Sequence, residues 1–246
     1  MNTTTIFKRI RNFILTDVGT NNGSDRNSWI IETLSKIPTG KKILDAGAGE
    51  CQFKQYCSHL QYTSQDFGQY DGTGDNTGIQ MNKWDNTKLD IVGDITDISV
   101  PDHSYDIILC TEVFEHIPDP ISAIKEFSRI LKSGGKLIVT APFCSMTHFA
   151  PYHFYSGFNR YFYYTNLEKH GFLIDELRTN GSFFDFVAQD IKTLSFITEK
   201  YTRMKVNLYQ KIIMVLMLRI LKKFKKNDIR SSELLCFGYQ VIATKK

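Results

Sequence analysis

A glycine turn directly after a short, largely apolar run is the first sign of a ligand site in this sequence. Residues 42–44 are followed by Asp45, and the next residues include Gly47 and Gly49. Because glycine has no Cβ, such a turn can bend sharply and bring backbone N–H groups close to a bound group. Gly-x-Gly turns also occur in NAD-binding sheets and in plain tight turns, so this motif alone leaves the ligand open.

Three further acidic residues, Asp66, Asp94 and Glu112, follow later apolar runs. In an open parallel sheet the strand ends line one edge, where ligands bind. Four acids on one edge, Asp45 included, would repel one another unless a ligand rich in hydroxyl and amino donors satisfied them. Asp66 stands about 20 residues past the turn, where a carboxylate holds a ribose diol, and Asp94 is placed to accept from an adenine amine. Each acid alone could instead cap a helix or solvate a loop, but the set favours a nucleoside site.

Strands and helices must alternate to bring these acids to one edge, and the sequence predicts that they do. Strands are predicted at residues 42–44, 62–65, 88–93, 105–110, 136–140, 172–177 and 234–244. Helices are predicted at 24–36, 51–60, from 120 to the glycines at 134–135, from 165 to 170, at 183–201 and at 204–226. The pattern predicts an α/β fold, a Rossmann-like, doubly wound, mostly parallel sheet in a single domain with a helical insertion before the last strand.

Helix-start signals refine this organisation. Asp119 with Pro120 predicts an N-cap and first turn, and Thr165 with Glu168 predicts a capping box. The expected divisions are N-terminal helices in residues 1–40, beginning with a short amphipathic helix at 1–15, and one domain over 41–246 that contains an acceptor loop at 142–165 and a helical insertion at 183–226.

Residues 43–143 resemble the class I S-adenosylmethionine-dependent methyltransferases, in particular those of small molecules. The resemblance rests on five ordered motifs: I-L-D-A-G-A-G-E at 43–50, Asp66, G-D-I at 93–95, T-E-V-F-E-H-I-P-D-P at 111–120 and L-K-S-G-G-K-L-I-V-T-A-P at 131–142. The chain departs from nucleotide-binding glycine motifs in one respect, since Glu50 and Cys51 stand where a third glycine would follow. That departure disfavours a pyrophosphate and therefore NAD.

The resemblance implies S-adenosyl-L-methionine as cofactor and assigns contacts along the predicted edge. The implied contacts are Asp45, Ala46, Gly47 and Gly49 at the glycine turn and methionine end, Asp66 and Phe67 at the ribose, Asp94 and Ile95 at the adenine, and Cys110, Thr111 and Glu112 near the sulfonium.

The acceptor loop at 142–165 is rich in aromatic residues and contains two histidines, His148 and His153. A hydroxyl acceptor needs a base, and we expect that base to be His148, His153 or His116; the alternative is a hydrophobic cluster with structural histidines. His148, His153 and Asp185 could be imagined as metal ligands, but their spacing is not diagnostic of a metal site. No metal is expected.

Charge is concentrated in one segment. Residues 201–226 carry eight Lys or Arg and no acid, whereas the whole chain has a net charge of +4. This distribution argues against nucleic-acid binding. Residues 204–226 lie within this segment, and their apolar part is too short to span a bilayer. Three roles remain for them: a buried or subunit-contact helix in a homodimer, a helix resting peripherally on a membrane, or a cover for the acceptor pocket. Five scattered cysteines and the lack of a visible signal peptide predict a cytoplasmic protein, with peripheral contact at the inner face of the membrane left open.

These features predict a methyltransferase that acts on a small acceptor, preferably at a hydroxyl of a sugar or related metabolite. The alternatives are C- or N-methylation of a quinone, lipid or amine, and, from another class, a non-catalytic nucleoside-binding protein of the same fold. The intact acids at 45, 66 and 94 argue against the last alternative.

Overall fold

The computed structural model describes residues 16–81 and 83–246, which form two compact units. The sheet unit comprises Arg26–Asn180 and Gly238–Lys246. The helical unit comprises Gly181–Phe237 with residues 16–25. The amphipathic helix predicted at 1–15 lies outside the described residues.

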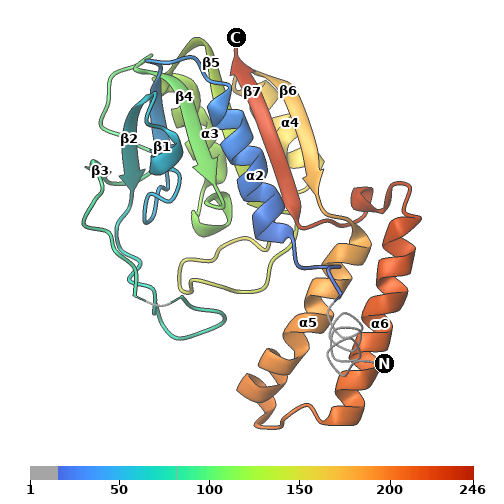
Figure 1. Cartoon of the computed structure of the whole chain (residues 1–246). Coiled ribbons are helices and arrows are strands. Elements are labelled where there is room, and N and C mark those ends of the chain that lie inside the picture. The colour runs from blue at the N-terminus through green and yellow to red at the C-terminus, as the bar shows by residue number, and fades with distance from the viewer. Residues whose placement is uncertain (1–15, 82) are drawn as a thin grey trace. The chain divides into compact units, whose positions relative to one another are not determined.

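The sheet unit is built on a seven-stranded sheet of order β3-β2-β1-β4-β5-β7-β6 (Figure 1). Its strands are β1 (Lys42–Ala46), β2 (Gln61–Asp66), β3 (Ile91–Val92), β4 (Tyr105–Thr111), β5 (Leu131–Pro142), β6 (Phe172–Asn180) and β7 (Gly238–Lys245). The first five strands pair in parallel, and β7 pairs antiparallel with both β5 and β6. The predicted Rossmann-like, doubly wound, mostly parallel sheet is confirmed.

The order of the strands defines where a ligand can enter. From β1 the chain runs outward through β2 and β3, and from β4 it runs outward in the opposite direction through β5. The loops that follow β1 and β4 therefore diverge and leave a crevice at the carboxyl ends of these two strands.

Three helices cover the sheet: α2 (Asn22–Ser35), α3 (Pro120–Ile130) and α4 (Arg160–Lys169). Figure 1 shows α2 on one face and α3 and α4 on the other. Trp29, Ile30 and Leu34 of α2 pack in one buried cluster with apolar residues of β1, β4 and β5. As predicted, Asp119 caps α3, since its side chain accepts from the N–H groups of residues 121 and 122.

Several predicted elements differ from the structure in type or bounds: the strands predicted at 88–93, 136–140 and 234–244 are Ile91–Val92, Leu131–Pro142 and Gly238–Lys245, and the helix predicted at 204–226 begins at Leu208. Three further differences have a clear physical reason. Residues 51–60 form successive turns and one short 3-10 helix, η1 (Lys54–Tyr56), because their N–H groups bond three residues back rather than four. The helix α3 ends at Ile130, before the glycines at 134–135, because Leu131 already pairs with Tyr105 as the start of β5. The helix α4 begins after Asn159, whose side chain accepts from the first-turn N–H groups, so the predicted capping box at Thr165 does not form.

The helical unit contains α5 (Phe183–Thr202) and α6 (Leu208–Lys226), each opened by a capping box. Its small core joins Val18 and Ala188 to Leu218 and Leu221 of α6. The buried carboxylate of Asp185 accepts from Ser182 and pairs with Lys225 at 2.8 Å. Over the described ranges, none of the helices is long and apolar enough to cross a membrane.

Candidate active site

A cavity of about 640 Å³ lies at the carboxyl ends of β1, β2 and β4. Its volume falls within the range of small-molecule sites. It is walled by the glycine turn after β1, the end of β2, residues 93–95, the segment after β4 and the aromatic part of the acceptor loop. The crevice expected from the strand order is therefore a pocket lined by these five segments.

The glycine turn runs close against its neighbours. Gly47 and Gly49 have φ values of +75° and +52°, in the left-handed region that favours glycine. A Cβ on Gly47 would lie 2.3 Å from the side chain of Val113, and a Cβ on Gly49 would lie 2.6 Å from the ring of Trp84. Both positions therefore require glycine to keep this wall of the cavity in place.

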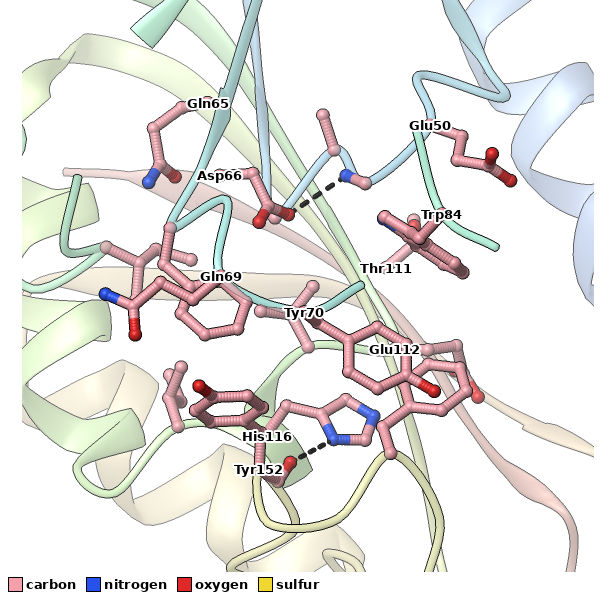
Figure 2. Close-up of a pocket in the computed structure, with 18 of the residues that line it drawn as sticks. Glu50, Gln65, Asp66, Gln69, Tyr70, Trp84, Thr111, Glu112, His116 and Tyr152 are labelled. Carbon is pink, nitrogen blue, oxygen red and sulfur yellow. Dashed lines mark hydrogen bonds between the residues drawn. The ribbon is translucent and has the colours of Figure 1, made fainter. Parts of the chain in front are cut away.

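Asp66 and Gln65 present acceptors at the end of β2. The Asp66 carboxylate accepts from Gly49 N–H at 3.0 Å and from Gly68 N–H at 2.9 Å, which fixes its orientation (Figure 2). The Gln65 side chain donates to Gly93 O at 2.8 Å, and its own oxygen is buried without a hydrogen-bond partner among the described residues. An unpaired buried acceptor in a cavity wall calls for a donor from a ligand.

The cavity is lined by more acids than bases. Its acids are Glu50, Asp66, Asp94 and Glu112, against one permanently charged base, Arg26. Arg26 pairs with Glu112 at 2.7 Å. Glu112 also has a φ of +54°, an uncommon conformation for a residue with a side chain, of the kind that clusters at functional sites. The surplus of negative charge favours a ligand with positive charge.

Aromatic rings from two loops close one side of the cavity. Tyr70 stacks on Phe149 with ring centroids 4.7 Å apart, and Trp84 meets both rings edge-on. Phe67 meets Tyr152 at 4.9 Å. Backbone hydrogen bonds between residue 79 and residues 147 and 149 tie the two loops together. We call Tyr70, Trp84, Phe149 and Tyr152 the aromatic lid.

A cluster of one acid and three histidines stands beside the lid. Glu115 and His116 belong to the 3-10 helix η2 (Phe114–His116), and His148 and His153 come from the acceptor loop. The His116 ring lies 4.6 Å from that of His148 and 6.0 Å from that of His153, between centroids. His116 Nδ1 lies 2.6 Å from Tyr152 O, which joins the two segments (Figure 2).

Burial shifts the pKa values of Glu115 and His116, two members of this cluster. Glu115 is 1% exposed, and burial, followed by the charge of Glu112, raises the pKa of its carboxyl well above the ordinary value. Burial, together with the neighbouring His148, lowers the pKa of His116 to about 3. His116 is therefore neutral at physiological pH and offers a lone pair rather than a charge.

The structure brings most of the predicted site residues to the cavity. Those that line it are Gly47, Gly49, Asp66, Phe67, Asp94, Ile95, Thr111, Glu112 and His116. Asp45, Ala46 and Cys110 are buried within β1 and β4 instead. Asp45 accepts a 2.6 Å hydrogen bond from Tyr62. His148 and His153 stand next to His116 rather than in the cavity wall.

Sequence reasoning missed Arg26, Gln65, Tyr70 and Trp84 as lining residues. Two aromatic residues in an otherwise polar loop, Tyr70 and Trp84, were a usable signal. Gln65 precedes the predicted ribose acid and could have been found in the same way. Arg26 lies on a helix far from every motif, and no pattern in the sequence pointed to it.

Comparison with known proteins finds a methyltransferase domain within the sheet unit. Residues 44–139 match a family model described as "Methyltransferase domain". A protein named ubiquinone biosynthesis O-methyltransferase from Vibrio cholerae serotype O1 is 46% identical over 33 residues, which are 13% of this chain and 14% of that protein. The protein of the same name from Aliivibrio fischeri is 27% identical over 113 residues, or 45% and 47% of the two chains. The matches thus span less than half the length of these relatives.

Solved structures share the fold at low sequence identity. A SAM-dependent methyltransferase from Archaeoglobus fulgidus has a TM-score of 0.54 and 16% identity, covering 90% of this chain and 92% of its own. Phosphoethanolamine N-methyltransferase 2 from Haemonchus contortus, solved with S-adenosyl-L-methionine, has a TM-score of 0.51 and 16% identity, with coverage of 90% and 52%. The [4+2]-cyclase SpnF has a TM-score of 0.54, 16% identity and coverage of 90% and 80%.

Residues 44–139 thus match a methyltransferase domain, and the sheet unit has the fold of S-adenosylmethionine-dependent class I methyltransferases. The cofactor of this class is S-adenosyl-L-methionine, and the cavity fits it. The orphaned Gln65 oxygen and the fixed Asp66 carboxylate offer acceptors for the hydroxyl and amino donors of a nucleoside. Gly47 and Gly49 leave room that a side chain would fill, and the acidic lining suits a sulfonium and an ammonium group.

Proposed function

We propose that this protein transfers the methyl group of S-adenosylmethionine to a hydroxyl of a sugar or related metabolite. The observation that carries the proposal is the cluster of Glu115, His116, His148 and His153 at the edge of the cofactor cavity. An amine acceptor needs only to be neutral before it reacts, whereas a hydroxyl needs a group that takes its proton. A cluster of imidazoles next to the cavity therefore supports a hydroxyl acceptor.

Bound S-adenosylmethionine supplies an electrophilic methyl group on a sulfonium. The acceptor oxygen forms a bond to the methyl carbon while the carbon–sulfur bond breaks, its electron pair stays on sulfur, and the hydroxyl proton leaves to the histidine cluster. Asp66, Gln65 and Asp94 hold the nucleoside, the glycine turn leaves room for the methionine end, and the aromatic lid excludes water. Alignment and desolvation of this kind are the main contributions a protein makes to methyl transfer.

His148 and His153 are the better candidates for the final proton acceptor. The pKa of His116, lowered to about 3, makes that ring a weak base at neutral pH. His153 Nε2 lies 3.2 Å from Ser145 Oγ, so a hydroxyl is already within hydrogen-bonding distance of this ring. His116 then serves to orient the other two rings.

The experiment is transfer of a radiolabelled methyl group to a nucleotide sugar, a catechol and a primary amine. We expect label on a hydroxyl, and we expect His153→Ala or His148→Ala to slow transfer at least ~10-fold. The matched control is His170→Ala, which removes the histidine directly after α4, whose ring also bonds to a carbonyl. Label on the amine alone would contradict the proposal, and cofactor binding without transfer to any acceptor would favour a non-catalytic nucleoside-binding protein.

A second acceptor class is an aromatic hydroxyl of a ubiquinone precursor. The names of the Vibrio and Aliivibrio relatives favour it, and the rings of the aromatic lid would pack well against a flat acceptor. The catechol in the panel tests this candidate, since transfer to the catechol and not to the sugar would select it. C- or N-methylation of a quinone, lipid or amine would appear as label on carbon or nitrogen.

We also infer that α6 rests on the anionic inner face of a membrane in the cytoplasm. Its outward stripe consists of Leu208, Tyr209, Ile212, Ile213, Leu216, Met217, Ile220 and Phe224, all exposed. Five cations follow between Arg219 and Lys226, of which Lys222 and Lys225 pair with acids of the helical unit. Apolar side chains beside basic ones are typical of helices that lie in a membrane interface. None of the five cysteines, all of which lie within the described residues, is in a disulfide, which supports a reducing compartment.

Co-sedimentation with phosphatidylserine-containing vesicles tests this contact at low and high salt. Ile212→Glu should lose most binding, whereas Ile229→Glu, an exposed isoleucine outside the stripe, should not. Absence of binding at either salt concentration would contradict the membrane proposal. A concentration-dependent dimer that Ile212→Glu disrupts would assign the stripe to a second copy of the chain instead.

A further inference from the structure

Three side chains of the cluster converge closely enough to share one ion. The ligand atoms of Glu115, His116 and His148 all lie within 4.8 Å of one another. We infer that these residues form a binding site for a divalent transition-metal ion of the zinc class. The spacing of histidines along the chain predicted no metal, and the site arises only because the acceptor loop folds back on η2.

The two histidines are held in the tautomer that a metal needs. His116 Nδ1 lies 2.6 Å from Tyr152 O, and His148 Nδ1 lies 2.8 Å from Met146 O. A carbonyl oxygen can only accept, so both Nδ1 atoms carry the proton and both Nε2 atoms keep a lone pair. Metal-binding histidines almost always donate their second nitrogen in this way.

The lone pairs point at a common carboxylate. His116 Nε2 lies 3.7 Å and His148 Nε2 lies 3.9 Å from Glu115 Oε1. A tetrahedral ion with bonds of about 2.0–2.1 Å holds its ligand atoms about 3.4 Å apart. The two carboxylate distances would therefore shorten by about 0.3–0.5 Å on binding, and the widest separation in the triad, up to 4.8 Å, would shorten by up to about 1.4 Å through rotation of the side chains.

One oxygen of the buried Glu115 carboxyl also lacks a hydrogen-bond partner among the described residues. Glu115 is 1% exposed, and neither its Oε2 nor His116 Nε2 has a hydrogen-bond partner within residues 16–81 and 83–246. The nearest permanent cation in the cavity wall, Arg26, is paired with Glu112. Burying an acid without a partner is costly, and a divalent ion would satisfy the acid and both lone pairs at once.

The ligand set indicates which ions bind. Two imidazole nitrogens with one carboxylate form the set used by zinc in several hydrolytic enzymes, with the fourth position open. Magnesium and calcium prefer oxygen ligands throughout. Zinc and related ions such as cobalt(II) are therefore expected to bind more tightly than magnesium.

The fourth coordination position of such an ion would be open to the acceptor hydroxyl. This consequence rests on the proposed function. A bound ion would make the acceptor hydroxyl more acidic. With His148 held as a ligand, His153, whose ring lies 4.8 Å from that of His148 between centroids, would be left to take the proton, while the oxygen bonds to the methyl carbon and the carbon–sulfur bond breaks toward sulfur. Such an ion would support O-methylation, because a neutral amine needs no such activation.

The test measures binding of ZnCl₂ and CoCl₂ to the full chain after treatment with a chelator. Wild type is expected to bind one ion per chain and to give the visible absorption of tetrahedral or five-coordinate cobalt(II). His148→Ala and Glu115→Gln are expected to weaken binding at least ~100-fold, beyond the loss caused by removing an outer-shell partner. His170→Ala is the matched control and should bind as wild type does.

Each outcome separates the metal site from the proposed function. Cobalt absorption with thiolate character would place the ion on cysteines and overturn the inference, as would unchanged affinity in both His148→Ala and Glu115→Gln. If Glu115→Gln does not fold, the half-buried His148→Ala variant decides. Full O-methyl transfer by protein that binds neither ion would uphold the function while rejecting the metal site.

Discussion

Asp66 is oriented before any ligand binds, because two backbone N–H groups already hold its carboxylate. Hydrogen bonds to a charged group contribute about 1.5–3 kcal/mol. We therefore expect Asp66→Ala to weaken S-adenosylhomocysteine binding roughly 10- to 100-fold by calorimetry. Asp66→Asn removes the charge but keeps the size of the side chain, so it separates the two contributions to affinity. The exposed Asp97→Ala is the control and should bind S-adenosylhomocysteine normally. Unchanged affinity in both Asp66 variants would remove this residue from the cofactor site.

Asp45 makes stability depend on pH. Burial, opposed by the hydrogen bond from Tyr62, raises the pKa of this carboxyl from 3.8 to about 7. A raised pKa means that the folded state binds the proton more tightly, so the contribution to stability is present below about pH 4 and is lost as the pH rises toward 7.

Asp45→Asn removes this titration while keeping an acceptor for Tyr62. We expect the variant to gain stability relative to wild type between pH 5 and pH 8, by at most about 1.4 kcal/mol per pH unit below 7. Urea unfolding at the two pH values measures the difference. A variant-to-wild-type difference that does not change with pH would show that Asp45 titrates normally.

For individual residues, the sequence predicted cavity-lining positions better at the ends of strands than inside them. Asp66 is the last residue of β2 and Asp94 lies two residues beyond β3, so both reach the cavity. Asp45 and Cys110 lie one or more positions inside β1 and β4, where the neighbouring strands cover them. A shift of one residue decides which side of a strand a side chain faces, and strand ends are predicted only to within a few residues.

The aromatic lid makes cofactor binding observable through one tryptophan. Trp84 lines the cavity, whereas Trp29, the other tryptophan of the chain, is buried in the core. Titration with S-adenosylhomocysteine is expected to change the fluorescence of wild type and of Trp29→Phe, but not of Trp84→Phe. A signal that survives in Trp84→Phe would mean that the lid does not cover the cofactor.

Elements with strong periodicity or clear caps were predicted well, as in α2, β4, α5 and the start of α3. The failures have different causes, either a pairing partner distant in sequence or an unrecognised local cap. Leu131 is apolar and helix-compatible, yet it joins β5 because Tyr105 of β4 lies beside it. The aromatic start of α4 was assigned to the acceptor loop because Asn159 was not recognised as its cap.

Cofactor binding should stabilise the entire chain. A ligand at 100 times its Kd adds about 2.7 kcal/mol to the free energy of unfolding. For a chain of 246 residues we expect the Tm to rise by roughly 5–10 °C with saturating S-adenosylhomocysteine. NAD should produce no shift, because the acidic lining repels a pyrophosphate. A shift with NAD alone would contradict the cofactor assignment.

The architecture of the sheet unit followed from local alternation of strands and helices, which the sequence displays directly. The assembly of the histidine cluster did not, because η2 and the acceptor loop are joined by backbone hydrogen bonds that have no sequence signature. The class of function could therefore be predicted from the sequence, whereas the residues that gather on the acceptor side could be identified only from the folded structure.

The position of β7 has a consequence for folding. This strand follows β6 and the helical unit in the sequence, yet it lies between β5 and β6, and within the described residues it is the strand that β6 pairs with. Until β7 docks, β6 has no strand beside it and β5 exposes an open edge. A folding intermediate without β7 is therefore the form of the chain most exposed to edge-to-edge aggregation.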